Sequence, residues 1–416
     1  MARPAARSAY ALLRRLAATI TEAMFWGVAN VTLPQPNCAL GFTRRVAGLR
    51  LVLALAMLAA LAACAERPGQ GMLRPVAATG VGIPTDILVA TTRDRSTSDP
   101  NGYTDGRART LNYEQYTISI PPDHVSGQIE WPDQPPGDPA RNMVVTKAKP
   151  LDRTDFDRLL AKRNTGEVLV FVHGYNTNYQ EAVYRVAQLA HDSGFPGTVV
   201  AFAWPSRGTL TGYVADREST TYSRDYLEQF LDDLAARPGV KHIDLVAHSM
   251  GNWLAVETLR QAKLRAHSAF LPKLGEVFLM SPDIDVDVFR TQLDVIGRLK
   301  QPMTVLVSTD DRALAASQTL AGDVPRVGNV NVDNPAAEAA IQKYDLRVID
   351  LSKVESDDRL RHSKFLSVLP KLRDMARQDE AARRGNPISR TGLFVVDTAG
   401  NILQSPLRLG AAVLGQ

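Results

Sequence analysis

Short apolar segments alternate with longer amphipathic segments through most of the chain after residue 85. The clearest apolar segments, Glu167–Val172, Thr198–Trp204 and His242–Ala247, are nearly continuous, which is typical of strands buried on both faces. A stretch with helical periodicity follows each of them. Repeated strand–helix–strand units predict a mostly parallel central sheet with helices on both faces.

Further segments of the same two kinds extend this pattern on both sides. Strands are predicted over residues 86–92, 115–120, 167–172, 198–204, 242–247, 276–280, 303–308 and 346–351. Helices are predicted over residues 152–162, 179–192, 223–236, 253–265 and 286–299. The region between residues 121 and 139 is rich in proline and is expected to be a loop.

The first 84 residues differ in character from the rest. Arginines precede an apolar run over residues 51–63, and the sequence LAAC occupies 61–64, as in a secretory signal. LAAC resembles the lipobox of bacterial lipoproteins, which implies cleavage before Cys64 and lipidation of its thiol. The protein would then face the periplasm from a membrane of the bacterial envelope, with the outer membrane expected. The alternative is a membrane anchor or an uncleaved apolar stretch.

These features predict four parts of the chain. They are a leader over 1–63 (whose start codon could lie further downstream), a lipid-anchored linker over 64–84, an α/β domain over 85–370 and a C-terminal extension over 371–416.

Charge and cysteine content exclude several classes of function. The net charge is +4, but residues 1–63 hold seven arginines against one glutamate, which leaves −2 for the rest. No basic surface for nucleic acid is therefore expected. Cys38 and Cys64 are the only cysteines, so residues 65–416 offer no disulfide, cysteine nucleophile or cysteine metal ligand. We predict neither a cofactor nor a metal ion.

A candidate nucleophile stands where one predicted strand meets a helix. Residues 242–252 read HIDLVAHSMGN, so Ser249 occupies a sharp strand-to-helix turn, as in a nucleophile elbow. The residues two before and two after such a serine must be small, and here they are Ala247 and Gly251. Ala247 departs from the usual glycine. The alternative for Ser249 is an ordinary helix N-cap.

The loop after an earlier strand carries candidate donors for an oxyanion. Residues 171–176 read FVHGYN, and in this kind of site a backbone N–H from that loop acts together with the N–H that follows the nucleophile. The predicted donors are Tyr175 and Met250, and Gly174 would allow the close approach. His173 is expected to brace its own loop.

Two aspartates compete for the role of the acid that orients a base. Residues 305–314 read VLVSTDDRAL, and a small-x-x-Asp turn counted from Ser308 selects Asp311. Asp310 would then be a turn or cap residue. Asp283, which follows the preceding strand, is the alternative acid.

The predicted base is His362, because it lies in the loop after the last predicted strand. His124 lies in the proline-rich loop, His191 and His267 lie on helices, and His242 opens a strand. Ser249, Asp311 and His362 follow the nucleophile–acid–base order of α/β-hydrolases. In the predicted reaction His362 takes the proton of Ser249, and an acyl-enzyme forms and is hydrolysed.

Four segments together resemble one family. They are residues 171–176 (FVHGYN), 202–208 (FAWPSRG), 247–252 (AHSMGN) and 281–289 (SPDIDVDVF). They are similar to the uncharacterised bacterial α/β-hydrolases of DUF900, and the resemblance extends over residues 86–365. It implies the α/β-hydrolase fold and an esterase/lipase-like activity of undefined substrate. In that setting Trp204 and Tyr213 are candidate pocket residues, with a core tryptophan and a solvated helix start as the alternatives.

The favoured function is hydrolysis of a carboxylic ester, with a small-molecule or lipid acyl group as substrate. An amidase, peptidase or thioesterase would use the same residues. A binding lipoprotein of the envelope that has lost turnover is the non-enzymatic alternative, since fold alone does not decide function.

Overall fold

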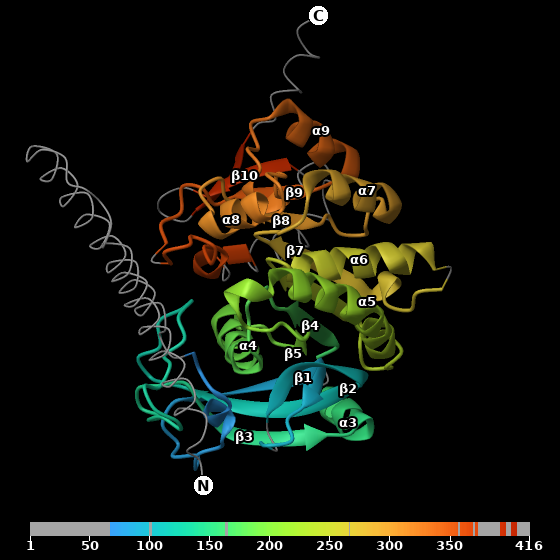
Figure 1. Cartoon of the computed structure of the whole chain (residues 1–416). Coiled ribbons are helices and arrows are strands. Elements are labelled where there is room, and N and C mark those ends of the chain that lie inside the picture. Colours follow the sequence, from blue (N-terminus) through green and yellow to red (C-terminus); the bar gives the residue numbers. More distant parts are fainter. Residues whose placement is uncertain are drawn as a thin grey trace, which may run out of the picture. The chain divides into compact units, whose positions relative to one another are not determined.

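An extended sheet runs through the described part of the molecule (Figure 1). This computed structural model describes residues 67–99, 102–162, 165–265, 267–356, 358–368, 371–372, 392–396 and 401–405. The described residues from Pro68 onward group into one unit by their contacts. The predicted leader, Cys38 and Cys64 lie outside the described residues.

Within these ranges the sheet has eleven strands in the order β11-β10-β9-β8-β7-β6-β4-β5-β1-β2-β3. Neighbouring strands from β1 to β10 in this order are parallel, and β2, β3 and β11 join at the two edges as antiparallel strands. The strands are β1 Ile83–Arg95, β2 Tyr103–Ile120, β3 Val144–Leu151, β4 Glu167–Val172, β5 Thr198–Ala203, β6 His242–His248, β7 Leu274–Met280, β8 Thr304–Val307, β9 Arg347–Asp350, β10 Gly392–Val396 and β11 Ile402–Ser405.

Helices connect most of the parallel strands, as expected for a sheet covered on both faces. They are α3 Arg153–Lys162, α4 Tyr179–Ser193, α5 Tyr213–Ala235, α6 Gly251–Leu264, α7 Val286–Ile296, α8 Arg312–Leu320 and α9 Pro335–Tyr344. None of the helices in the described ranges is both long enough and apolar enough to span a bilayer.

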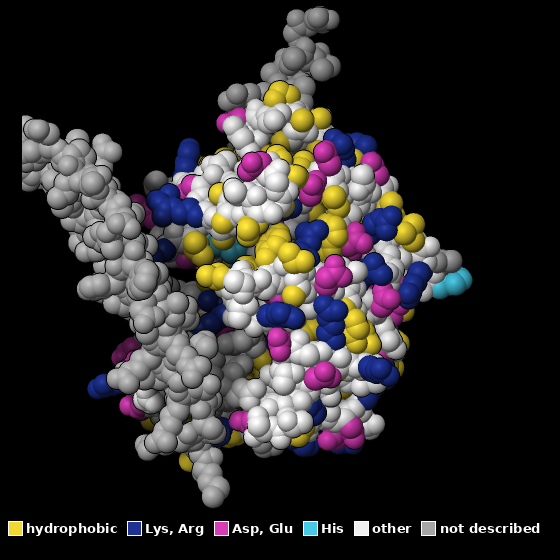
Figure 2. Space-filling view, in the orientation of Figure 1, with side chains coloured by type: hydrophobic (Ala, Val, Ile, Leu, Met, Phe, Trp, Pro, Cys, Tyr) yellow, Lys and Arg dark blue, Asp and Glu magenta, His cyan; other side chains and the backbone are white. Residues whose placement is uncertain are grey.

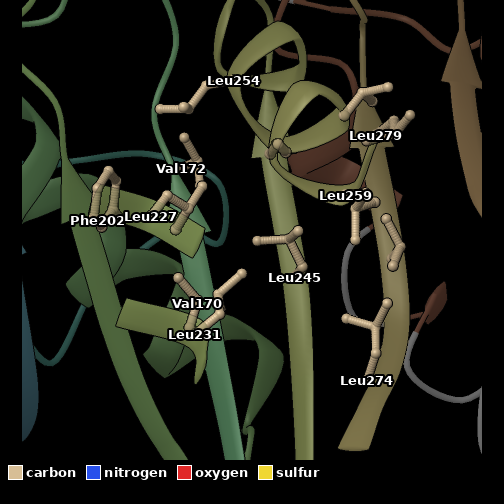
Figure 3. Packing of buried hydrophobic residues seen from close by; sticks show 14 of the residues in the cluster. Val170, Val172, Phe202, Leu227, Leu231, Leu245, Leu254, Leu259, Leu274 and Leu279 are labelled. Carbon is tan, nitrogen blue, oxygen red and sulfur yellow. The ribbon is translucent and has the colours of Figure 1, made fainter. Parts of the chain in front are cut away.

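The core divides into two layers because successive side chains of a strand point to opposite faces. Val170 and Val172 of β4 join a cluster with helices α5, α6 and α7, and Figure 3 shows them beside Leu245, Leu254 and residues of α5. Phe171, between the two valines, joins the other cluster, which contains α4. Both clusters are built of closely packed aliphatic and aromatic side chains, so the central strands are held from both sides.

The boundaries of the predicted parts need correction. Met72 and Leu73, within the predicted linker, are buried in the cluster that contains α4. Strand β10, within the predicted C-terminal extension, pairs with β9, and β11 pairs with β10. The folded domain therefore begins before residue 85 and continues past residue 370.

Positive and negative side chains intermingle over the face shown in Figure 2, and no single-sign patch is visible there.

Candidate active site

Ser249 occupies the turn between β6 and α6 in a left-handed backbone conformation, with φ of 53°. Few residues other than glycine adopt this conformation, and its presence marks a constrained turn. The Ser249 N–H donates to the carbonyl of Met280 at 3.0 Å, and its carbonyl accepts from the N–H of Asn252 at 3.1 Å. These bonds fix the turn between two neighbouring parallel strands.

Two glycines allow other backbone segments to pass close to this turn. A Cβ at Gly251 would lie 2.3 Å from the carbonyl oxygen of His173, which is far inside contact distance. A Cβ at Gly174 would lie 2.9 Å from the Cβ of Ser249. The loop after β4 and the turn after β6 are therefore packed directly against each other, as the predicted oxyanion arrangement requires.

His362 and Asp311 are hydrogen-bonded, with 2.7 Å between Nδ1 of the imidazole and Oδ2 of the carboxylate. Asp311 is fully buried. Its other oxygen, Oδ1, accepts from the N–H of Leu314 at 3.0 Å, so Asp311 is also the N-cap of α8. A cap of this kind holds the carboxylate in one orientation. Asp310, expected at a turn or cap, lies in the turn before α8, and its carboxylate pairs with Lys364 at 2.6 Å and Arg361 at 2.8 Å.

Asp283, the alternative acid, has different partners. Its carboxylate accepts from the hydroxyls of Ser317 at 2.5 Å and Tyr213 at 3.0 Å, and it forms an ion pair with Arg326 at 3.3 Å. All of these groups are at least partly buried. The structure therefore brings Asp311, and not Asp283, into hydrogen-bonding contact with His362.

The loop that carries His362 is tied down at several points. The carboxylate of Asp358 accepts from the N–H groups of His362 at 3.0 Å and Ser363 at 3.2 Å. Lys364 is buried and donates to Asp310 and to the carbonyls of Leu351 and Ser352. These contacts fix the loop to the ends of β8 and β9, so the imidazole position does not depend on the Asp311 contact alone.

His248 connects the Ser249 turn to the His362 loop. Its ring centroid lies 4.6 Å from that of His362, and its Nε2 donates to the His362 carbonyl at 3.4 Å. The Ser281 hydroxyl donates to the same carbonyl at 3.4 Å. Among the hydrogen bonds of the described residues, none joins Ser249 to His362. Catalytic hydrogen bonds often form only when substrate is bound, so the lack of this bond is compatible with a catalytic pair.

The two histidines differ in their electrostatics. Burial lowers the pKa of His248 well below its usual range, and the nearby His362 lowers it further, so His248 is neutral at pH 7. Burial also lowers the pKa of His362, but the hydrogen bond that its Nδ1 donates to Asp311 and the charges of Asp311 and Asp283 outweigh it and raise that pKa. The raised pKa of His362 suits a group that accepts protons near neutral pH, and the lowered pKa of His248 does not. No local sequence pattern points to His248, because its contact with His362 spans 114 residues.

Met250, one predicted oxyanion donor, directly follows Ser249, and Gly174, which precedes the other donor Tyr175, lies against the Ser249 turn. Met250 is the N-cap of α6, so its N–H belongs to the group of helix-terminal donors that lack an acceptor within the helix. Tyr175 follows Gly174, and its ring lies edge-on to that of Tyr213, with 5.3 Å between centroids. Asp216 supports the loop: its carboxylate accepts from the N–H of Asn176 at 3.3 Å.

Trp204 is a core residue. Its side chain is fully buried, its ring stacks on His173 with 4.8 Å between centroids, and its Nε1 donates to the His173 carbonyl at 2.7 Å. The expectation that Trp204 lines a pocket is therefore wrong, and the alternative that it is a core tryptophan holds. Burial lowers the pKa of His173 to about 3, so its ring is neutral and braces its own loop. Tyr213 is half-buried beside Tyr175 and stays a candidate for the substrate side of the site.

Comparison with known proteins identifies the family of this chain. Residues 149–377, more than half of the chain, match the family described as alpha/beta hydrolase of unknown function (DUF900). The chain belongs to this family. Membership of DUF900 confirms the predicted α/β-hydrolase fold and the resemblance drawn from the four sequence segments.

Individual relatives of this DUF900 protein are distant. The uncharacterised protein alr1448 of Nostoc sp. is 24% identical over 200 residues, which cover 41% of this chain and 50% of the relative. The chain thus spans about half the length of the curated relative it matches.

Two solved structures are also similar. They are a lipase-esterase related protein from Clostridium acetobutylicum (12% identity, 53% of this chain and 95% of that one, TM-score 0.25) and fungal esterases from Rhizomucor miehei (13% identity, 86% and 93%, TM-score 0.25). Similarity at this level gives no information on substrate.

Proposed function

We propose that this DUF900 member is a serine hydrolase that cleaves carboxylic esters. Ser249 is its nucleophile, His362 its general base and Asp311 the acid that orients the base. The observation that carries the proposal is the 2.7 Å hydrogen bond between His362 Nδ1 and Asp311, in a loop that contacts the turn of Ser249. A bond from Nδ1 to a carboxylate leaves Nε2 as the proton acceptor.

The reaction proceeds in two stages. The Ser249 hydroxyl oxygen attacks the ester carbonyl carbon while its proton passes to His362 Nε2. The N–H groups of Tyr175 and Met250 stabilise the negative oxygen of the tetrahedral intermediate. When the intermediate collapses, the alcohol leaves with the proton from His362 and an acyl-Ser249 ester remains. Water then attacks this ester by the same route, which releases the acid and regenerates Ser249.

A fluorophosphonate probe tests the nucleophile, because it phosphonylates only activated serines. The wild-type protein should be labelled, and Ser249→Ala should not. Ser223→Ala is the control and should be labelled like the wild type, since Ser223 is also buried but lies on α5, where its hydroxyl bonds that of Thr92. An unlabelled but folded wild-type protein, or label that persists in Ser249→Ala, would refute the assignment.

The class of substrate needs a separate measurement. Hydrolysis rates on matched p-nitrophenyl esters, thioesters and anilides of the same acyl group compare the leaving groups directly. We expect the ester to be cleaved fastest. Faster cleavage of the thioester or anilide would keep the serine mechanism and replace the ester assignment.

We also propose that Cys64 anchors the protein to a membrane through a lipid, with the domain on the periplasmic side. The support is the LAAC sequence after the apolar run. Cells fed a radioactive fatty acid should label the wild-type protein and Cys38→Ala, but not Cys64→Ala. Labelling that is absent in the wild type would refute the anchor.

A further inference from the structure

A second cluster of polar side chains lies where the proline-rich loop meets the end of α4. His124 belongs to the loop between β2 and β3, and His191 and Asp192 belong to the last turn of α4. One nitrogen of each histidine and one oxygen of Asp192 lie within 4.8 Å of one another. Two imidazoles and a carboxylate are a ligand set that binds zinc and similar divalent transition-metal ions, here called ions of the zinc class.

Surrounding groups hold two of these ligands, His124 and Asp192, in a defined orientation. Nδ1 of His124 faces the carboxylate of Glu130 at 2.8 Å, which directs Nε2 toward Asp192. The Oδ2 atom of Asp192 accepts from the N–H of Gly127 at 2.6 Å and from the hydroxyl of Ser126 at 3.0 Å, so Oδ1 is the atom that faces His124. A carboxylate behind a ligating imidazole and donors behind a ligating carboxylate are the usual support of metal sites.

The His124–Asp192 contact requires a positive charge. When Nδ1 of a neutral imidazole donates to Glu130, its Nε2 presents a lone pair to Asp192 Oδ1 at 2.8 Å. Two lone pairs at this distance repel unless a proton or a cation lies between them. Only 6% of the His124 side chain and 1% of the Asp192 side chain is exposed, so water screens the repulsion poorly.

The helix and its neighbours also favour a cation here. The cluster lies at the C-terminal end of α4, where the helix dipole stabilises positive charge. Arg185 is close, but its Nη1 donates to the Gly127 carbonyl and to Gln188. Glu130 and Asp192 thus place two carboxylates against His124, one at each ring nitrogen.

We propose that His124, His191 and Asp192 bind a divalent ion of the zinc class, with water as a further ligand. The ion would fasten the loop after β2 to α4. Helix α4 has 15 residues and begins just beyond the loop of Tyr175, so the ion lies about 22 Å, one helix length, from the proposed oxyanion donors. The site is therefore structural. This proposal departs from the expectation from the sequence that no metal is bound.

Calorimetric titration of the EDTA-treated full chain with ZnCl₂ tests the site. The wild type should bind one zinc ion per chain, and His191→Ala and Asp192→Asn should weaken binding by at least about 100-fold. His267→Ala is the matched control, because His267 is an exposed histidine outside the cluster. Zinc at a hundred times its Kd should raise the Tm of the wild type by about 5 °C and leave that of His191→Ala unchanged.

Two results would overturn the proposal. One is a wild-type protein that takes up no zinc, which would mean that a proton bridges His124 and Asp192. The other is uptake that His191→Ala leaves unchanged, which would place the ion elsewhere. Far-UV circular dichroism checks folding. If Asp192→Asn does not fold, His191→Ala decides, since the His191 ring makes no hydrogen bond within the described structure.

Discussion

Replacing Asp311 by asparagine changes one atom of the proposed catalytic group and retains most of the packing. The amide oxygen can still accept from the Leu314 N–H and cap α8, because asparagine caps helices as well as aspartate does. The amide nitrogen then faces Nδ1 of His362, where the carboxylate oxygen now accepts at 2.7 Å. Two donors cannot share that contact. His362 must place its proton on Nε2, and it can no longer accept the proton of Ser249.

The expected loss follows from this change of tautomer. A base held in the wrong tautomer lowers kcat by about 10⁴-fold, which corresponds to about 5.5 kcal/mol at about 1.36 kcal/mol for each factor of ten. Loss of a hydrogen bond to a charged group costs folding about 1.5–3 kcal/mol. The protein should therefore stay folded while its activity nearly disappears.

Hydrolysis of a short p-nitrophenyl ester measures the effect, and urea unfolding measures stability. Asp285→Asn is the matched control, because Asp285 caps α7 through its carboxylate. It should keep activity within a few-fold of the wild type. Asp283→Asn tests the alternative acid. If Asp311→Asn retains more than a tenth of the wild-type activity, or loses less than Asp283→Asn, our assignment of the acid is wrong.

Three further predictions concern the surroundings of the site. Gly251→Ala should lower the free energy of unfolding, measured in urea, by about 1–3 kcal/mol, because the new Cβ meets the His173 carbonyl at 2.3 Å. The control Gly239→Ala, with no atom within 4 Å of its added Cβ, should change that free energy by less than about 0.5 kcal/mol. In the pH profile of kcat/KM, the fall on the acid side should have an apparent pKa above the usual histidine value of about 6.5, because the base must be neutral and the pKa of His362 is raised. An apparent pKa at or below that value would contradict the proposed environment of His362. Trp204→Phe removes the donor to the His173 carbonyl, so it should lower the free energy of unfolding by about 1 kcal/mol and leave KM unchanged. A large rise in KM at constant stability would show that Trp204 lines the substrate pocket.

The centre of the fold could be predicted from the sequence because its strands are buried on both faces. Such strands read as nearly continuous apolar runs, and β4, β5 and β6 differ by at most one residue from the predicted ranges. The edges gave weaker signals. Strand β3, with the sequence VVTKAKPL, lies at the edge of the sheet, where lysine and proline are tolerated and the pattern resembles a loop. Helix α9 is not among the predicted helices, although its start has a local sequence signal, with Asn334 as cap and Pro335 as first residue.

The candidate site was predictable where chain order and local motifs decide it. A strand-to-helix turn selected Ser249, and the loops after later strands selected Asp311 and His362. Contacts between distant segments were not predictable. The packing of His248 on His362 and the burial of Trp204 depend on how loops meet at the sheet edge, and no local pattern encodes that.

The pairing of β10 with β9 has a practical consequence. The family match ends at residue 377, yet β10 begins at Gly392 and adds to the sheet beyond β9. A chain shortened to the matched region would lose this neighbour and leave the backbone N–H and C=O groups of one side of β9 without their strand partner. Exposed edges of this kind recruit strands from other molecules. A protein expressed only up to the family boundary would therefore be prone to aggregate through the exposed edge of β9, next to the loop that carries His362.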